Sequence, residues 1–110
     1  MYCIFCSILN GQLPSAKIAE TSSLIVIKDI NPKASIHYLI IPKSHVADIQ
    51  ALEHDQLDAA RDIFVMAQQL SKTVAGADDF KLHINSGKNA GQLVMHLHAH
   101  FLAGKLTGTP

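Results

Sequence analysis

Apolar and polar residues follow one another in short runs along most of the chain, and these runs predict five strands. Turn residues separate the runs, as is typical of strands joined by short connections. The predicted strands cover residues 17–20, 24–29, 37–41, 80–85 and 96–102. Residues 4–9 form a predicted short helix that stops at Asn10-Gly11, and Pro14 prevents its continuation.

A helical period replaces the strand pattern between Asp55 and Val74. Apolar or small residues recur there every three or four positions, as they do on the buried face of an amphipathic helix. The predicted stripe consists of Leu57, Ala60, Phe64, Ala67, Ser71 and Val74, and Ile63, Met66 and Leu70 widen it. Gly76 and the Asp78-Asp79 pair end this one long helix.

The order of these elements predicts an α+β fold. A short helix, three strands, a long helix and two more strands favour a mainly antiparallel sheet of about five strands with helices packed on it. The chain has 110 residues, which is enough for one hydrophobic core and too few for two. We therefore expect a single domain over residues 1–110. The pattern alone does not fix the order of the strands in the sheet.

Charge and composition narrow the classes of function. Nine basic residues balance nine acidic ones, so no long-range positive field is available to hold a nucleic-acid backbone. No apolar run reaches the roughly 18 to 20 residues of a membrane span, and the first residues lack the basic and apolar regions of a secretory signal. We expect a cytoplasmic protein that binds a small ligand, with no nucleic-acid partner and no membrane partner.

Three histidines at every second position, His96, His98 and His100, carry the most specific chemistry of the chain. Side chains alternate between the faces of a strand, so three such imidazoles would lie on one face, about 7 Å apart. The intervening Leu97 and Ala99 would then point into the core. Imidazole titrates near neutral pH, which suits it to nucleophilic attack, proton transfer, anion contact or metal ligation.

Further segments accompany the three histidines from the beginning of the chain to its last quarter. They are Cys3-Ile4-Phe5-Cys6, Asp29-Ile30-Asn31-Pro32, His37 with Leu39-Ile40-Ile41-Pro42-Lys43 and His45, then Asn85 and Gly91-Gln92. Together with the triad, this pattern resembles the histidine triad (HIT) nucleotide-binding family over nearly the whole chain. It is similar to the Hint and bacterial Hit branch, because the uridylyltransferase branch has glutamine in place of the third histidine. The resemblance implies the HIT fold.

The resemblance also implies covalent nucleotide chemistry at His98. This residue would attack the α-phosphorus of a purine nucleoside 5′-phosphoramidate or related adenylate, and water would then release a monophosphate such as AMP or GMP. A neutral imidazole can attack in this way if its other nitrogen donates a proton, and we expect a backbone carbonyl as the acceptor. His100, Asn85 and Gln92 match family positions that contact phosphate or ribose. Taken singly, Asn85 and Gln92 are also typical loop-capping residues.

A ribose and purine pocket follows from the same resemblance. Asp29 matches the family acid that accepts hydrogen bonds from the ribose hydroxyls. The apolar walls around the purine match Phe5, Ile8, Leu13, Ile27 and Ile30, although each of these residues taken alone is more often part of a core. The role of His37, which lies near the triad in the family fold, stays open. His54 and His83 are assigned to the surface or to packing.

Some family members bind zinc, and the matching ligands here are Cys3, Cys6, His45 and His96. Two thiolates and two imidazoles satisfy the tetrahedral preference of zinc with no open position, which is typical of a structural site. The alternative interpretation is that the two cysteines are free of metal or form a redox pair. A third interpretation places a catalytic metal on all three triad histidines.

One feature leaves the substrate open. Many Hint members have a serine after the Gly-Gln pair, close to the leaving group, whereas this chain has Leu93, which donates no hydrogen bond. The alternatives are therefore a dinucleoside polyphosphate hydrolase, or a purine-nucleotide-binding module with little catalysis.

The family typically forms homodimers through the long helix and the edge of the sheet, and the width of the apolar stripe on residues 55–74 is compatible with this.

Overall fold

The structure, a computed structural model, describes residues 3–110, and its elements follow the predicted order. They are helix α1 (Ile4–Leu9), strands β1 (Lys17–Glu20), β2 (Leu24–Lys28) and β3 (Ala34–Pro42), the 3-10 turn η1 (His54–Gln56), helix α2 (Leu57–Thr73), strand β4 (Phe80–His83), the 3-10 turn η2 (Lys88–Ala90) and strand β5 (Ala99–Leu106). The α+β class and the five strands are confirmed. The short helix matches its predicted bounds to the residue.

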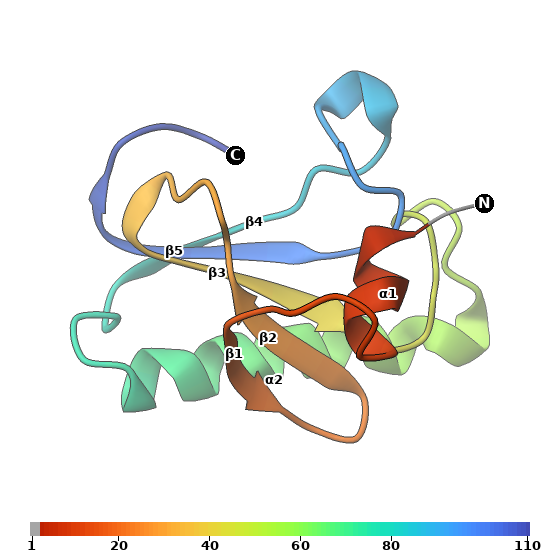
Figure 1. The fold of residues 1–110 in the computed structure, drawn as a ribbon, viewed down its shortest axis with the longest axis horizontal. Coiled ribbons are helices and arrows are strands. Elements are labelled where there is room, and N and C mark those ends of the chain that lie inside the picture. Colours follow the sequence, from red (N-terminus) through yellow and green to blue (C-terminus); the bar gives the residue numbers. More distant parts are fainter. Residues whose placement is uncertain (1–2) are drawn as a thin grey trace.

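All five strands form one antiparallel sheet in the order β1-β2-β3-β5-β4 (Figure 1). Strands β3 and β5 are neighbours in this order, although the long helix and β4 separate them in sequence. Their register places Leu39 opposite His100 and His37 opposite Leu102. Two histidines that lie 63 residues apart in the chain thus meet on one part of the sheet.

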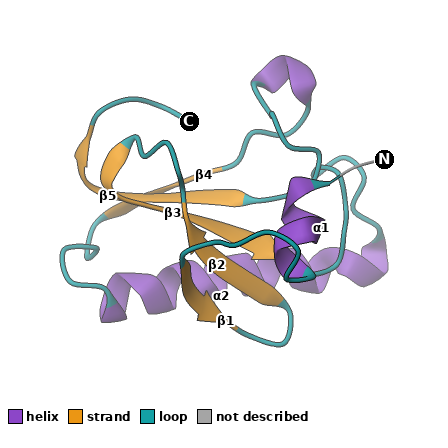
Figure 2. Ribbon diagram, in the orientation of Figure 1, coloured by secondary structure: helices purple, strands orange, loops and turns teal. Residues whose placement is uncertain are grey.

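The sheet is covered by helices, α2 on one face and the shorter α1 on the other (Figure 2). The packing of strand β2 explains why its apolar run is unbroken. Leu24 and Val26 pack into the cluster beneath α2, whereas Ile25 and Ile27 pack into the cluster beneath α1. Because both faces of this strand are covered, it needs apolar residues at every position rather than at every second one.

The buried face of α2 differs from the predicted stripe. Its buried residues are Ala67, which belongs to the predicted stripe, and Ile63, Met66 and Leu70, which were expected only to widen it. Phe64, predicted to lie at its centre, is 66% exposed, and Leu57 is 49% exposed. Apolar residues occur around most of this helix, so periodicity alone selected the wrong side of a broad apolar arc.

The predicted histidine strand is also shorter than expected, because β5 begins only at Ala99. His96 and His98 lie in the segment just before it, where the backbone N–H of Leu97 donates to Val46 outside the sheet ladder. Leu97 and Ala99 are buried as predicted. Of the three histidines, only His100 thus lies within a strand, although the His98 and His100 rings still lie next to each other with their centroids 5.1 Å apart.

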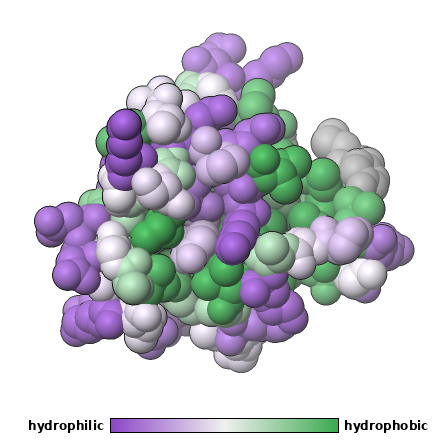
Figure 3. Space-filling view, turned by 60° about the vertical axis from the view of Figure 1, so that its left-hand side comes forward, coloured by the Kyte–Doolittle hydropathy of each residue, from purple (hydrophilic) through white to green (hydrophobic). Residues whose placement is uncertain are grey.

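Large exposed apolar side chains are spread over the molecule, and on the face drawn in Figure 3 they lie in separate groups among polar ones. The most exposed are Leu93 and Ile30, with 94% and 91% of their surface accessible, followed by Phe64 on α2. Among residues 3–110, no helix combines the length and the apolar character that a membrane crossing requires.

The position of α2 on the sheet predicts opposite outcomes for two adjacent substitutions. Ile63→Ala removes a side chain that is 2% exposed and should lower the free energy of unfolding by about 2 to 4 kcal/mol. Phe64→Ala removes a larger but exposed side chain and should change it by less than about 1 kcal/mol. Urea unfolding of both variants at low protein concentration measures this. A larger loss for Phe64→Ala would mean that the helix face is assigned wrongly.

Candidate active site

A cleft of about 380 Å³ opens where α1, the β2–β3 connection and the segment before β5 meet. Residues predicted to act on a nucleotide line it, namely Phe5, Asp29, Ile30, Asn85, His98 and His100. Other lining residues are Ile4, Asn31, Lys33, His37, Leu39, Gly91, Leu93, Val94 and Pro110. The cleft therefore combines apolar walls with a small number of polar groups, as ligand sites usually do.

His98 is held in one tautomer by the backbone. Its Nδ1–H donates to the carbonyl oxygen of His96 at 2.8 Å, so the acceptor is a backbone carbonyl, as predicted. Burial lowers the pKa of His98 and keeps the ring neutral. A neutral ring that carries its proton on Nδ1 has a free lone pair on Nε2. This arrangement is the one that a nucleophilic imidazole requires.

His37 and His100 form a directed chain of hydrogen bonds. The backbone N–H of Lys33 donates to His37 Nδ1 at 2.9 Å, and the proton of neutral His37 is therefore on Nε2. This Nε2–H lies 2.9 Å from His100 Nδ1, which must accept. Burial lowers the pKa of both rings, to about 3 for His100. His100 consequently carries its own proton on Nε2, from which it can donate to a ligand.

Asp29 lies beside this chain at the mouth of the cleft. Its Oδ2 is 3.3 Å from His37 Nε2 and 3.8 Å from His100 Nδ1, and its Oδ1 accepts the backbone N–H of Asn31 at 2.8 Å. The carboxylate is thus fixed in place while it remains partly accessible. A fixed carboxylate of this kind can accept hydrogen bonds from a pair of hydroxyl groups.

His83, which the sequence analysis assigned to the surface or to packing, positions Asn85. Its Nε2–H donates to Asn85 Oδ1 at 2.7 Å, because an amide oxygen can only accept. The amide nitrogen of Asn85 is thereby turned the other way, where it donates to the Pro110 carbonyl at 3.4 Å. Gly91 lines the cleft beside Asn85, in the same wall. Its backbone φ of 94° lies in the region that favours glycine.

Gln92 lies outside the residues that line the cleft. Its Oε1 accepts the N–H of Gly87 at 2.7 Å, and its Nε2 donates to the carbonyls of Ala47 and Val94 at 2.7 and 2.9 Å. These bonds use both N–H donors of the side-chain amide and engage its oxygen, and the residue is 3% exposed. Through these hydrogen bonds, Gln92 connects the loop around η2 to the loop after β3.

The apolar residues predicted to surround a purine fall into two groups. Phe5 and Ile30 line the cleft, and Phe5 also contacts the His98 ring edge-on, with the ring centroids 4.9 Å apart. Ile8, Leu13 and Ile27 are not among the lining residues. Ile27 is buried in the core cluster behind the wall, and Ile8 packs against that cluster.

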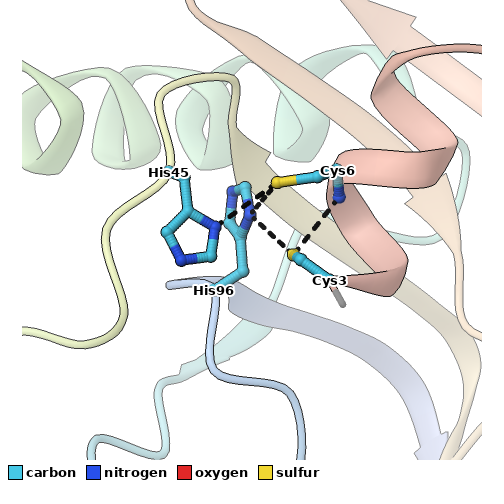
Figure 4. A group of neighbouring side chains, drawn as sticks. All are labelled: Cys3, Cys6, His45 and His96. Atoms are coloured by element: carbon cyan, nitrogen blue, oxygen red, sulfur yellow. Dashed lines mark hydrogen bonds between the residues drawn. The ribbon is translucent and has the colours of Figure 1, made fainter. Parts of the chain in front are cut away.

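The four predicted metal ligands converge in space (Figure 4). Cys3 is the N-cap residue of α1 and Cys6 lies in its first turn, His45 comes from the loop after β3, and His96 from the segment before β5. The sulfur-to-Nδ1 distances are 3.4 Å for Cys3–His96, 3.3 Å for Cys6–His45 and 3.6 Å for Cys6–His96. A tetrahedral zinc ion with ordinary bond lengths holds a sulfur and a nitrogen ligand about 3.5 Å apart, so this set fits the ion.

The electrostatics of this cluster fit a cation as well. His96 donates Nε2–H to the carbonyl of Pro42 at 2.7 Å, which leaves its Nδ1 lone pair facing the two sulfurs. Desolvation, then the hydrogen bond and the charge of Cys3, raise the pKa of Cys6. A bound cation reverses this effect, because it stabilises the thiolate form that ligates it.

A second group, Asp29, His37 and His100, also brings three potential ligand atoms together. The hydrogen bond from the Lys33 N–H occupies His37 Nδ1, however, so the neutral ring carries its proton on Nε2, the atom that would face a metal. A metal there would have to displace that proton and leave an imidazolate. The triad histidines themselves face different partners, which argues against a catalytic metal held by all three.

Comparison with known proteins supports the resemblance to the histidine triad family. Residues 2–109 match the family model described as scavenger mRNA decapping enzyme C-terminal binding. An uncharacterised HIT-like protein of Helicobacter pylori is 39% identical over 102 residues, covering 92% of this chain and 95% of the relative. The adenosine 5′-monophosphoramidase of Schizosaccharomyces pombe is 34% identical over 102 residues, covering 93% of this chain and 74% of the relative.

Solved structures agree in both fold and sequence. A HIT family hydrolase from Legionella pneumophila superposes with a TM-score of 0.89 at 32% identity, covering 99% of this chain and 98% of that one. A zinc-bound histidine triad family protein from Mycobacterium smegmatis has a TM-score of 0.83 at 30% identity, covering 96% and 76%. The fold and the sequence identity define a protein of the histidine triad type. The chain belongs to the HIT family.

The buried state of His100 predicts a specific loss of stability in acid. Its pKa is about 3 in the folded protein, against 6.5 when it is exposed, so below pH 6.5 only the unfolded chain takes up the proton. The stabilisation is complete above pH 6.5 and is lost as the pH falls towards 3. Between pH 6.5 and 5 this group alone should account for about 2 kcal/mol of the free energy of unfolding.

Urea unfolding at several pH values tests this in the wild type, in His100→Gln and in the control His54→Asn, which changes an exposed histidine. His100→Gln should show a shallower dependence on pH, and the control should keep the wild-type slope. Equal slopes in all three proteins would show that His100 is not held neutral.

Proposed function

We propose that this protein hydrolyses purine nucleoside 5′-phosphoramidates or related adenylates through a nucleotidyl-histidine intermediate on His98. The observation that carries the proposal is the bond from His98 Nδ1–H to a backbone carbonyl, which leaves Nε2 as a free nucleophile in the cleft. The named activity of the Schizosaccharomyces pombe relative supports this class of substrate.

The first step forms a bond between His98 Nε2 and the α-phosphorus and breaks the bond from phosphorus to the leaving nitrogen. The leaving amine needs a proton, which would come from the His100 Nε2–H that the tautomer chain leaves free at the cleft. Asn85, oriented by His83, and His100 would donate to the phosphate oxygens, which stabilises the charge that develops there. In the second step water attacks phosphorus, its proton returns to His100 Nε2, and the bond from phosphorus to His98 breaks. AMP or GMP then leaves, and both histidines are restored to their neutral forms.

The remaining cleft residues divide between sugar and base. Asp29 would accept hydrogen bonds from the ribose hydroxyls, and Phe5, Leu39 and Ile30 would contact the purine. No side chain among these is placed to read the edge of the base, so we expect little selection between adenine and guanine. Gln92 and Ile27 would act indirectly, by holding the loop and the wall respectively.

Leu93 favours one competing interpretation, a nucleotide-binding module with little catalysis. Its side chain is 94% exposed at the cleft and offers no proton to a leaving group. Under this interpretation the protein would bind AMP well and turn over phosphoramidates no faster than the uncatalysed reaction. A dinucleoside polyphosphate hydrolase would react faster with a diadenosine polyphosphate than with an adenosine phosphoramidate. This difference distinguishes it from both the phosphoramidate hydrolase and the binding module.

The test is release of AMP from a fluorogenic adenosine phosphoramidate by the wild type and by His98→Ala. The wild type should turn over and should form an acid-labile adenylylated protein after rapid quenching. His98→Ala should lose at least about 10³-fold in kcat and show no labelled protein, because the nucleophile is absent. Label on the His98→Ala protein would rule out this mechanism. His54→Asn, outside the cleft, should behave as the wild type.

For the metal site, we propose a structural zinc ion on Cys3, Cys6, His45 and His96. The matching sulfur-to-nitrogen distances and the zinc-bound Mycobacterium smegmatis relative support it. With four protein ligands the ion has no open position, so it would supply folding energy and no reacting group. The unmetallated or disulfide-linked state of Cys3 and Cys6 is the competing state.

Metal analysis of the purified protein should give one zinc per chain, and Cys3→Ser or His45→Asn should lower that number. Chelation should decrease the melting temperature by several degrees, while chemistry at saturating substrate persists. Instant and complete loss of kcat on chelation, with the fold intact by circular dichroism, would instead point to a catalytic metal.

We also propose a homodimer, formed through α2 and the neighbouring edge of the sheet. Phe64, Val65 and Leu57 are exposed on α2, and Phe80 is partly exposed on the edge strand β4. A solution mass equal to one chain would overturn the dimer. The cytoplasmic location stays a prediction from the sequence.

A further inference from the structure

We propose that the metal site and the nucleotide cleft are thermodynamically coupled, so that metal binding strengthens nucleotide binding and nucleotide binding strengthens metal binding. The inference rests on the proposed function and extends it to regulation of the same site. Two structural links between the sites carry it, one through His96 and one through α1.

The first link is His96, which belongs to both sites at once. Its Nδ1 faces the sulfurs of Cys3 and Cys6, at 3.4 and 3.6 Å. Its carbonyl oxygen accepts the Nδ1–H of His98 at 2.8 Å. The ring is completely buried, so its orientation also sets that of the adjoining backbone. A ligand that fixes this ring therefore also fixes the acceptor that selects the tautomer of His98.

The second link is α1, which carries metal ligands and cleft wall on adjacent residues. Cys3 and Cys6 face the metal site, whereas Ile4 and Phe5 line the cleft. Phe5 contacts both rings edge-on, with centroids 5.9 Å from His96 and 4.9 Å from His98. A six-residue helix is far too short to be stable by itself. Its order depends on the packing of Phe5 into the core and on what holds its first turn, where the metal ligands lie.

These links give the metal a role beyond general stability. When the four ligands from three separate segments are joined, the wall formed by α1 and the segment with His98 are fixed relative to each other before a nucleotide arrives. Less ordering then remains for the nucleotide to impose, which strengthens its binding. Because coupling free energies are reciprocal, the nucleotide must strengthen metal binding by the same factor.

Two binding measurements test the coupling without using catalysis. The first is the dissociation constant of AMP, by calorimetry, for the zinc-loaded wild type, the metal-free wild type, His45→Asn and the control His54→Asn. The second is the zinc affinity of the wild type, by competition with a chromogenic chelator, with and without saturating AMP. His45→Asn removes one exposed ligand and leaves the other three, so it keeps the comparison valid in a folded protein.

We expect AMP to bind about 10-fold more weakly to the metal-free protein and to His45→Asn than to the loaded wild type and to His54→Asn. AMP should raise the zinc affinity by a similar factor. AMP affinities within about two-fold in all four samples, with no effect of AMP on zinc, would overturn the coupling. Failure of AMP to bind any sample would instead overturn the proposed function, so the two failures are distinguishable.

Discussion

The chemistry of the cleft depends on backbone groups that decide where each imidazole carries its proton. The N–H of Lys33 turns His37 into a donor towards His100, and the carbonyl of His96 turns Nδ1 of His98 into a donor. His98 is thereby left with a free lone pair on Nε2 and His100 with a free N–H on Nε2, so a candidate nucleophile and a candidate proton donor lie next to each other. Side-chain partners would titrate or rotate, whereas these backbone groups are fixed by the fold.

Holding several imidazoles in a protein interior is costly unless every polar atom has a partner. Among the described residues, no buried side-chain nitrogen or oxygen lacks a hydrogen bond. Burial lowers the pKa of His37, His98 and His100 together, so the cluster avoids the mutual repulsion of charged rings. The neutrality needed for nucleophilic attack and the neutrality needed for a stable core are therefore the same condition.

The resemblance to the HIT family named the four candidate metal ligands that the structure brings together. Sequence patterns predicted the elements well, because elements depend on side-chain type and spacing. They failed on α2, where Phe64 and Ile63 are both apolar and only the sheet decides which one is buried. They also left His37 open and overlooked His83, since both act through partners distant in sequence or through a backbone N–H that no side-chain motif records. Gln92 shows the reverse case, because its family position predicted a ligand contact while the fold engages its amide with three backbone groups.

In the folded chain the three triad histidines do not all belong to one strand, as they would on an ideal strand. Because β5 begins at Ala99, the backbone at His96 and His98 is free of the sheet ladder and can turn its groups elsewhere. His96 uses that freedom to face the sulfurs on one side and to present its carbonyl to His98 on the other. If the strand extended through all three residues, the ladder would engage that carbonyl and the tautomer of His98 would no longer be selected. The start of β5 at Ala99 is therefore what allows His96 to face the candidate metal ligands while His98 keeps a free Nε2 in the cleft.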